Sequence, residues 1–223
     1  VGGTATNSAP GDVDFAAGST ALGVEWHSAA DFLADGFKMS ASFSTDSGAA
    51  KTATAKLDNS WGVGATYVTS AGDTALTIGA GFSGGDVANN DTQTTGGKEG
   101  FHAGVSAVTG DLTVAVGYGD GNSFVGTTTN QDVEFSVLKA GISYVTGDLT
   151  LAVGGTSASA KDSAFGATTT KDDSKDTLSG SVTYAVASGV SAVLGYLTED
   201  HQNDGVSATT GGSSWYIGAT MSF

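Results

Sequence analysis

The sequence contains no cysteine and no arginine, a single proline and no long apolar run. The absence of cysteine excludes disulfide scaffolds, zinc ribbons and thiol nucleophiles together. No run approaches the roughly 18 apolar residues of a membrane-spanning helix, although a strand of a membrane barrel crosses with only about ten. Basic residues are also scarce, 8 against 23 acidic ones, so the net charge of -15 excludes nucleic acid as a partner because nothing neutralises phosphates.

Glycine is abundant, with 35 of the 223 residues, and it is accompanied by much alanine, serine and threonine. Such a composition could indicate disorder, but a disordered chain would lack the alternation of apolar residues that begins after residue 18. At the end of the chain, for example, Trp215, Ile217, Ala219, Met221 and Phe223 alternate with small or polar residues. A strict period of two predicts β-strands, one face of which is apolar.

Pairs of alternating segments, separated by tight-turn signals, recur along the chain and predict antiparallel hairpins. Two of these hairpins, AGVSAVTGDLTVAVG at 103–117 and AGISYVTGDLTLAVG at 140–154, are close copies of each other. Five hairpins and a closing strand predict eleven strands in one domain, residues 1–223, of which 1–18 form a loop and 19–223 the repeats. Short turns are expected at one end of the sheet and longer polar loops at the other. The predicted turn glycines are Gly36, Gly72, Gly110, Gly147 and Gly189.

The face opposite the apolar one carries small residues such as Ser, Gly, Thr and Ala. A soluble sheet would present long charged side chains there, whereas a water-filled lumen tolerates small polar ones. The aromatic residues form two bands along the strands, as expected of girdles at two membrane interfaces; core aromatics would concentrate at the strand centres instead. Tyr67, Tyr144, Tyr184 and Phe223 lie near the short turns, and Trp61, Phe82, Phe101, Tyr118, Tyr196 and Trp215 near the long loops.

With this hairpin plan the chain resembles the C-terminal two thirds of a general diffusion porin of the alphaproteobacterial type, a 16-stranded trimeric barrel. The resemblance rests on the TYVTSAGD, AVTGDLTVAVG and YVTGDLTLAVG hairpins and on the closing SWYIGATMSF segment. It implies an all-β, antiparallel transmembrane β-barrel in the outer membrane of a Gram-negative bacterium. It further implies a homotrimer in contact with the lipid bilayer and lipopolysaccharide, and a C-terminal strand that the barrel-assembly machinery recognises.

Two departures from the porin pattern matter. An odd number of strands cannot close an antiparallel barrel without a parallel seam, so about five N-terminal strands are expected to be absent from this sequence. The arginine cluster with which such porins set a transverse field is also absent. If the family layout holds, residues 1–18 are the tail of the constriction loop and Asp12 and Asp14 are its acids; the alternative is an ordinary solvated loop.

The resemblance implies a passive, water-filled channel for ions and small hydrophilic solutes, and no enzymatic activity. Glu25, Lys38 and Lys139 fall on the inward face, where they either bias ion selectivity or merely solvate the wall. Without the arginine cluster, a net acidic lumen would favour cations. The alternative function is that of a structural or adhesive surface β-protein without channel activity.

No cofactor is expected, and other site chemistry is sparse. His102 and Ser106 share a face but lie about 13 Å apart along a strand, too far for a nucleophile and its base. Acidic loops are compatible with bound calcium, or with ions that bridge lipopolysaccharide phosphates, but the spacing of a calcium-binding loop is missing and solvated acid runs are the alternative. The acids concerned are Asp162, Asp172, Asp173, Asp176, Glu199, Asp200 and Asp204.

Overall fold

The computed structural model describes residues 23–44, 56–88, 96–127, 129–164, 172–202 and 210–222. They form a single antiparallel sheet of eleven strands, in which each strand pairs with its neighbours in the chain. The prediction of an all-β antiparallel meander is therefore confirmed. The strands are β1 (Gly23–His27), β2 (Phe37–Ser44), β3 (Lys56–Ala71), β4 (Thr74–Ala88), β5 (Gly96–Thr109), β6 (Leu112–Thr127), β7 (Thr129–Thr146), β8 (Leu149–Ala164), β9 (Asp172–Ala187), β10 (Val190–Gln202) and β11 (Thr210–Met221).

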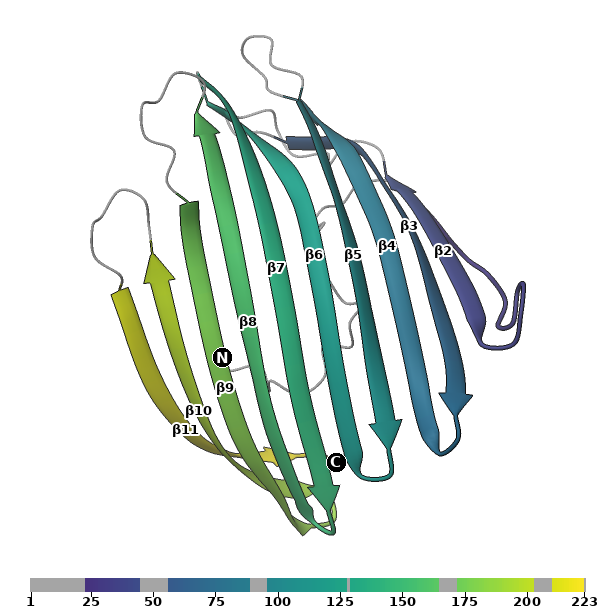
Figure 1. Ribbon diagram of the computed structural model, residues 1–223, viewed down its shortest axis with the longest axis vertical. Helices are drawn as coiled ribbons and strands as arrows, with labels where there is room; N and C mark the ends of the chain where they lie inside the picture. Colours follow the sequence, from purple (N-terminus) through teal and green to yellow (C-terminus); the bar gives the residue numbers. More distant parts are fainter. Residues whose placement is uncertain are drawn as a thin grey trace.

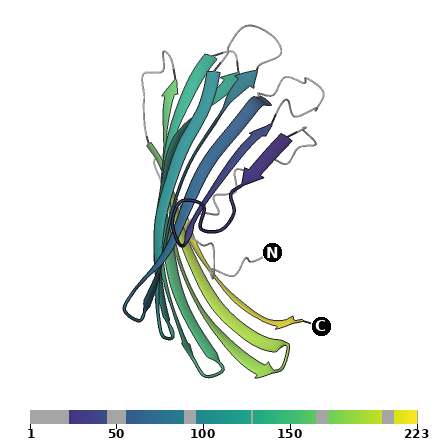
Figure 2. The same cartoon turned by 90° about the vertical axis from the view of Figure 1, so that its right-hand side faces the viewer.

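The sheet is a long curved wall rather than a closed barrel (Figure 1). Turned by 90°, it forms an open trough whose C-terminal strands bend toward the concave side (Figure 2). Within the described residues β1 and β11 are the two edges and do not pair with each other. No helix in this part of the chain is long and apolar enough to cross a membrane.

All five predicted turn glycines adopt positive φ, between 55° and 76°. In the β3–β4, β5–β6 and β7–β8 turns the loop is Gly-Asp, with positive φ at the glycine alone, which is the type II′ pattern favoured by strand twist. In the β9–β10 turn, Gly189 follows Ser188, and the pairing register shifts after Val190. The four turns lie at the lower end of the sheet in Figure 1.

The strands extend further from these turns than the sequence pattern predicted. The stretch between Tyr118 and Leu138 was expected to be mostly a loop, yet β6 and β7 stay paired as far as Thr127 and Thr129. The prediction was wrong there because the outward apolar alternation stops at Tyr118, whereas backbone hydrogen bonds between strands do not depend on that alternation. Loop length at this end is therefore shorter than the polarity of the sequence indicates.

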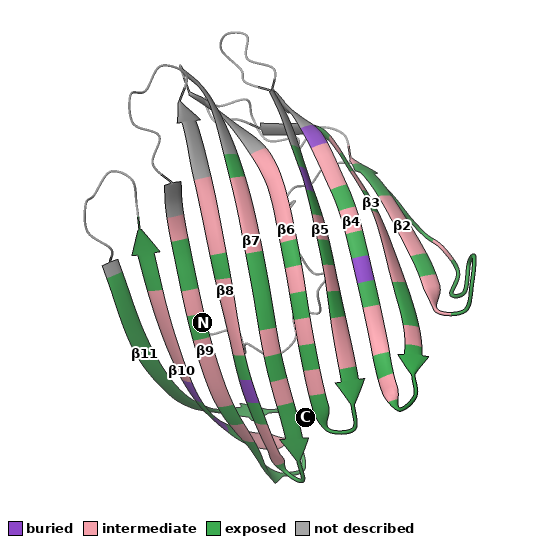
Figure 3. Ribbon diagram, viewed as in Figure 1, coloured by how far each residue is buried: buried purple, intermediate pink, exposed green. Residues whose placement is uncertain are grey.

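The described residues contain almost no hydrophobic core. Ala152 and Val193, each 7% exposed, are the buried apolar residues among them, while Ile217 is 87% exposed. Along the strands in the middle of the sheet, exposed and partly covered residues tend to alternate, whereas the edge strands β1 and β11 are exposed throughout their described side chains (Figure 3). A soluble domain of this size would bury its large apolar side chains, so the exposed apolar face needs an environment other than water.

Candidate functional site: outward belt and inner wall

Ten strands each carry four consecutive outward positions that are all aliphatic, aromatic, methionine or glycine. We call this surface the belt. It contains no charged residue and no serine or threonine. The belt consists of alternate residues of 37–43 on β2, 61–67 on β3, 76–82 on β4, 101–107 on β5, 112–118 on β6, 138–144 on β7, 149–155 on β8, 178–184 on β9, 190–196 on β10 and 215–221 on β11.

The belt ends abruptly on the side away from the tight turns. The next outward residue is polar on every strand from β5 to β11, and on β4 it is a glycine. Six steps of strand separate the first and last belt positions, about 20 Å along the strand, to which the terminal rings add their own length. This extent suits the apolar band of an outer-membrane barrel, about 25 Å tall. The bordering residues are Gly84, Glu99, Asp120, Ser136, Ser157, Asp176, Thr198 and Ser213.

The belt crosses the strands obliquely, as the pairing register shows. Phe82 and Phe101, at the loop-side end of the belt on β4 and β5, are direct partners. Phe101 is in turn opposite Asp120, so on β6 the belt begins two residues lower, at Tyr118. From β2 to β11, the loop-side belt residues of neighbouring strands are alternately direct partners and offset by two residues.

A slip of two residues over two strands corresponds to about 6.6 Å along the strand for about 9.6 Å across the sheet. The strands are therefore inclined by about 35° to the normal of the belt, a tilt within the range of transmembrane barrels. Hydrogen bonding between strands does not require this slanted border. A planar apolar layer crossed by tilted strands does.

Nine of the ten predicted girdle aromatics occupy the ends of the belt, and Phe223 lies outside the described residues. On the loop side, neighbouring rings touch across strands: Trp61 and Phe82 have centroids 5.4 Å apart, and Tyr196 and Trp215 4.5 Å apart. Phe101 and Tyr118 form a third pair at 5.9 Å. On the turn side, the ends of the belt carry Tyr67, Tyr144 and Tyr184. Their role at a membrane interface stays a prediction.

The opposite face, which we call the inner wall, carries the predicted lumen charges Glu25, Lys38 and Lys139. Lys38 and Lys139 belong to one cross-strand row of the sheet, in which they are opposite Thr66 and Thr156 respectively. Both lysines are exposed. Glu25 is also exposed, and its Oε1 lies 2.9 Å from Nε2 of His27. The structure places all three on the wall, and their effect on ions stays a prediction.

Sequence reasoning missed an ion pair on the same wall, between Nζ of Lys175 and Oε2 of Glu199 at 3.0 Å. Glu199 was expected in an acidic loop, but it lies on β10, opposite Thr177 of β9. Extension of the period-two pattern beyond Tyr196 would have placed Glu199 inward. Both side chains are about half exposed, so water screens the ion pair and it adds little to the stability of the fold. Its main effect is to place two charges on the inner wall.

Three rings on the inner wall lie over glycines of the neighbouring strand: His102 over Gly81, Phe135 over Gly121 and Tyr216 over Gly195. In each case the ring and the glycine are direct partners, and a Cβ on the glycine would meet ring atoms. Because the glycines have no Cβ, the rings can lie close to the neighbouring strand and project less into the lumen. From the sequence, His102 was considered only for catalysis, and Phe135 was not predicted to face inward.

The remaining predicted residues are not brought together. Asp12, Asp14 and Asp204 lie outside the described residues. The other acids proposed for calcium lie on strands β8, β9 and β10 rather than in compact loops, because those strands extend further than expected: Asp162, Asp172, Asp173, Asp176, Glu199 and Asp200. Within the described part of the chain, no group of three His, Asp or Glu residues could hold a metal ion. Calcium binding stays a prediction.

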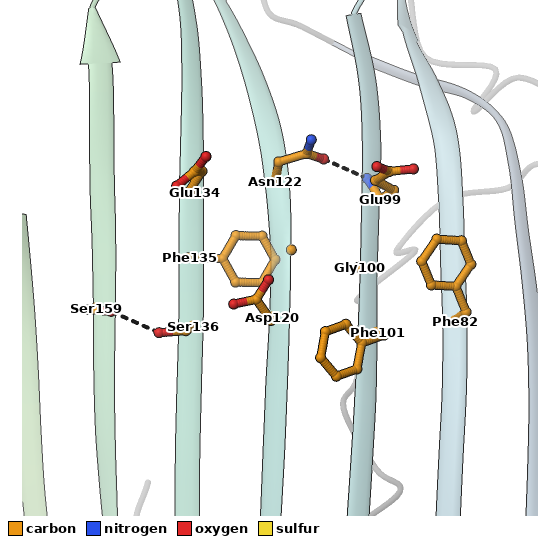
Figure 4. A pocket seen from close by; sticks show the side chains of 11 residues that line it. Phe82, Glu99, Gly100, Phe101, Asp120, Asn122, Glu134, Phe135, Ser136 and Ser159 are labelled. Carbon is orange, nitrogen blue, oxygen red and sulfur yellow. Dashed lines mark hydrogen bonds between the residues drawn. The ribbon is translucent and has the colours of Figure 1, made fainter.

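A hollow of about 400 Å³ lies just beyond the belt, across β4 to β8 (Figure 4). The belt rings of Phe82 and Phe101 contribute to its lining, as do the acids Glu99, Asp120 and Glu134. The lining is completed by Gly100, Gly121, Asn122, Phe135, Ser136 and Ser159. The backbone N of Glu99 donates to Oδ1 of Asn122 at 3.0 Å, and the Tyr118 hydroxyl donates to Oδ2 of Asp120 at 2.9 Å. The second contact joins a belt ring to an acid at the border, a position that suits a tyrosine because its ring is apolar and its hydroxyl is polar.

A meander of tilted antiparallel strands, with an apolar belt outside and a small polar wall inside, has the fold of the outer-membrane β-barrels. Among solved structures the chain is similar to the outer membrane channel DcaP of Acinetobacter baumannii, with a TM-score of 0.71 and 13% identity over 90% of this chain and 62% of that one. It is also similar to in-vitro folded OmpT, an outer membrane protein of Vibrio cholerae, with a TM-score of 0.58 and 19% identity over 89% of this chain and 63% of OmpT.

At these identities the likeness concerns the fold alone. The chain spans less than two thirds of the length of both proteins. No protein-family model and no curated protein matches the sequence.

Proposed function

We propose that this chain forms part of the wall of a passive channel through the outer membrane of a Gram-negative bacterium, open to ions and small hydrophilic solutes. The observation that carries the proposal is the contrast between the two faces of each strand. Residues 112–118, for instance, place Leu, Val, Val and Tyr outward and Thr, Ala and Gly inward. Outward residues suit hydrocarbon, and small inward residues leave room for water.

The similarity in fold to DcaP, an outer membrane channel, supports the same function. We further propose the 16-stranded porin type, a homotrimeric assembly, contacts with lipopolysaccharide and recognition of the C-terminal strand by the assembly machinery. Passive diffusion needs no catalytic group, and absence of enzymatic activity remains the expectation. The alternative, a surface β-protein without a channel, has to bury the belt in some other way, since the described residues form almost no core.

Thiol accessibility tests the channel directly, because the chain has no native cysteine. Lys139 and Ala140 are neighbours on β7 and face opposite sides of the sheet. In a bilayer, a charged, membrane-impermeant thiol reagent should modify Lys139→Cys and change the single-channel conductance. Ala140→Cys should stay unmodified until the protein is unfolded in denaturant.

The result separates the two functions. Equal modification of both cysteines in the membrane-free protein, with no conductance in bilayers, would favour the surface β-protein. Protection of Lys139→Cys in an inserted protein would show that the wall is dry and would refute a water-filled channel.

The charge preference of the channel is a separate matter. Among the acids whose side chains the structure describes, Glu25 and Glu199 lie on the inner wall, and each has a basic neighbour, His27 or Lys175. The other acids with described side chains lie at the turns, in the β1–β2 connection or on the outer face. The cation preference expected from the composition therefore stays a prediction, and Lys38 and Lys139 are positive charges on the described wall that oppose it.

Lys139→Gln should move the reversal potential in a salt gradient toward cation preference, because it removes one positive charge from the wall. Glu134→Gln is the matched control, since Glu134 lies on β7 as well but lines the hollow on the outer face. Screening over about 10 Å at 0.1 M salt should leave the reversal potential of this variant unchanged. A shift of similar size toward anion preference in Glu134→Gln would contradict the assignment of faces.

A further inference from the structure

The β1–β2 connection, residues 28–36, differs from the other described connections at the turn side of the sheet. The four others are two-residue turns, Gly-Asp or Ser-Gly, without an apolar side chain. This one is longer and carries Phe32 and Leu33, which are 48% and 71% exposed. Exposed large apolar side chains in a polar turn region indicate a contact surface.

The connection is a folded unit. The backbone N of Phe32 donates to the carbonyl of Phe37 at 3.1 Å, and the N of Phe37 donates to the carbonyl of Ala34 at 3.0 Å. The N of Gly36 donates to Oδ1 of Asp31 at 2.6 Å, so this carboxylate is engaged by the backbone. These bonds satisfy backbone groups internally, which a segment needs before it can enter an apolar environment.

The exposed residues continue the belt. The ring of Phe32 packs edge-on against Trp26, with centroids 5.8 Å apart. Trp26 lies outward on β1 and is opposite Ala41, a belt residue of β2. The connection then leads into Phe37, the turn-side end of the belt on β2. One apolar surface therefore runs from the belt through Trp26 to Phe32.

We propose that Phe32 and Leu33 form a lipid anchor, which inserts into the boundary between head groups and acyl chains of the leaflet on the turn side. The occupant is the bilayer because the patch is continuous with the belt and lies at the belt's turn-side end. Large apolar side chains are favourable at this depth. The inference rests on the proposed membrane insertion of the belt.

Quenching by brominated phosphatidylcholine tests the anchor in the full chain. The three tryptophans are replaced by phenylalanine, and one tryptophan is introduced at a time. Leu33→Trp reports on the anchor, Ile142→Trp on the middle of the belt, and Ser188→Trp on a polar turn at the same side. Each variant is folded into vesicles whose lipids carry bromine either near the head group or in the middle of the acyl chain.

We expect the emission of Leu33→Trp to lose most of its intensity with bromine near the head group and less with bromine at mid-chain. Ile142→Trp should show the reverse order, and Ser188→Trp little quenching by either lipid. Leu33→Trp emission as unquenched as that of Ser188→Trp, with Ile142→Trp quenched, overturns the anchor and leaves the channel proposal intact. A blue-shifted but unquenched Leu33→Trp also overturns it, because the occupant is then protein. If Ile142→Trp is itself unquenched, membrane insertion fails as well.

Discussion

Ile142→Arg should destabilise the membrane-folded protein by about 2 to 4 kcal/mol, because it places a charge near the middle of the belt, where hydrocarbon replaces water. Leu138→Arg, at the loop-side end of the belt on the same strand, should cost about 0 to 1 kcal/mol. The two side chains are equally exposed in the sheet, at 48% each. The difference thus isolates depth in the membrane from burial in the protein. Denaturant titration of folding into lipid vesicles measures both free energies.

Ser143→Arg provides the control for the arginine itself. Ser143 is the next residue along β7 and faces the inner wall, so this variant should remain close to the parent in stability. Equal free energies for Ile142→Arg and Leu138→Arg would mean that both positions lie in the same medium, and the membrane assignment of the belt would then be wrong.

Gly36→Ala should destabilise far more than Gly110→Ala, although both glycines have positive φ, 76° and 55°. The left-handed backbone costs a residue with a Cβ about 1 to 2 kcal/mol, and this is the expected loss for Gly110→Ala, where open space surrounds the new atom. At Gly36 the Cβ would collide with the backbone of Val68, whose N donates to the Gly36 carbonyl at 2.8 Å. The total loss there should be on the order of 4 kcal/mol or more.

The same vesicle-folding titration measures the two variants, and gel migration with and without heating provides a second readout of folding. Gly72→Ala and Gly147→Ala should behave like Gly110→Ala, since no atom lies within 4 Å of a Cβ at either site. A Gly36→Ala variant as stable as Gly110→Ala would show that the contact between β2 and β3 at Val68 yields easily, contrary to the structure.

The positions of the turns were predictable because local chemistry determines them. A two-residue hairpin turn needs a residue with positive φ, and glycine supplies it without steric cost. Gly110 and Gly147 repeat in nearly identical sequence contexts, and both adopt that conformation. The outward faces were predictable for a similar reason, since alternation along a strand assigns each side chain to one of two sides.

The strand ends and the Lys175–Glu199 pair were not predictable from the same signals. Beyond the belt, outward residues become polar, and polarity alone does not distinguish a loop from a paired strand that leaves the membrane. Phe135 is an example, because beyond the belt this large apolar residue faces the inner wall, whereas the apolar belt residues of the same strand, such as Ile142, face outward. Contacts between β9 and β10 depend on the pairing register, and the sequence of a single strand does not determine that register.

The sequence by itself therefore determined an antiparallel meander, its tight turns and the side of the sheet on which each belt residue lies. Only the tertiary structure decided the slant of the belt and which wall residues are neighbours. The reason is that alternation is unchanged by a shift of two residues, whereas a shift of one would invert every face. Tight turns set the register within a hairpin, but the pairing of Phe82 with Phe101 is set across a longer connection. With that pairing, the belt is displaced by two residues at every second strand and always in the same direction. The strands are therefore inclined to the normal of the belt.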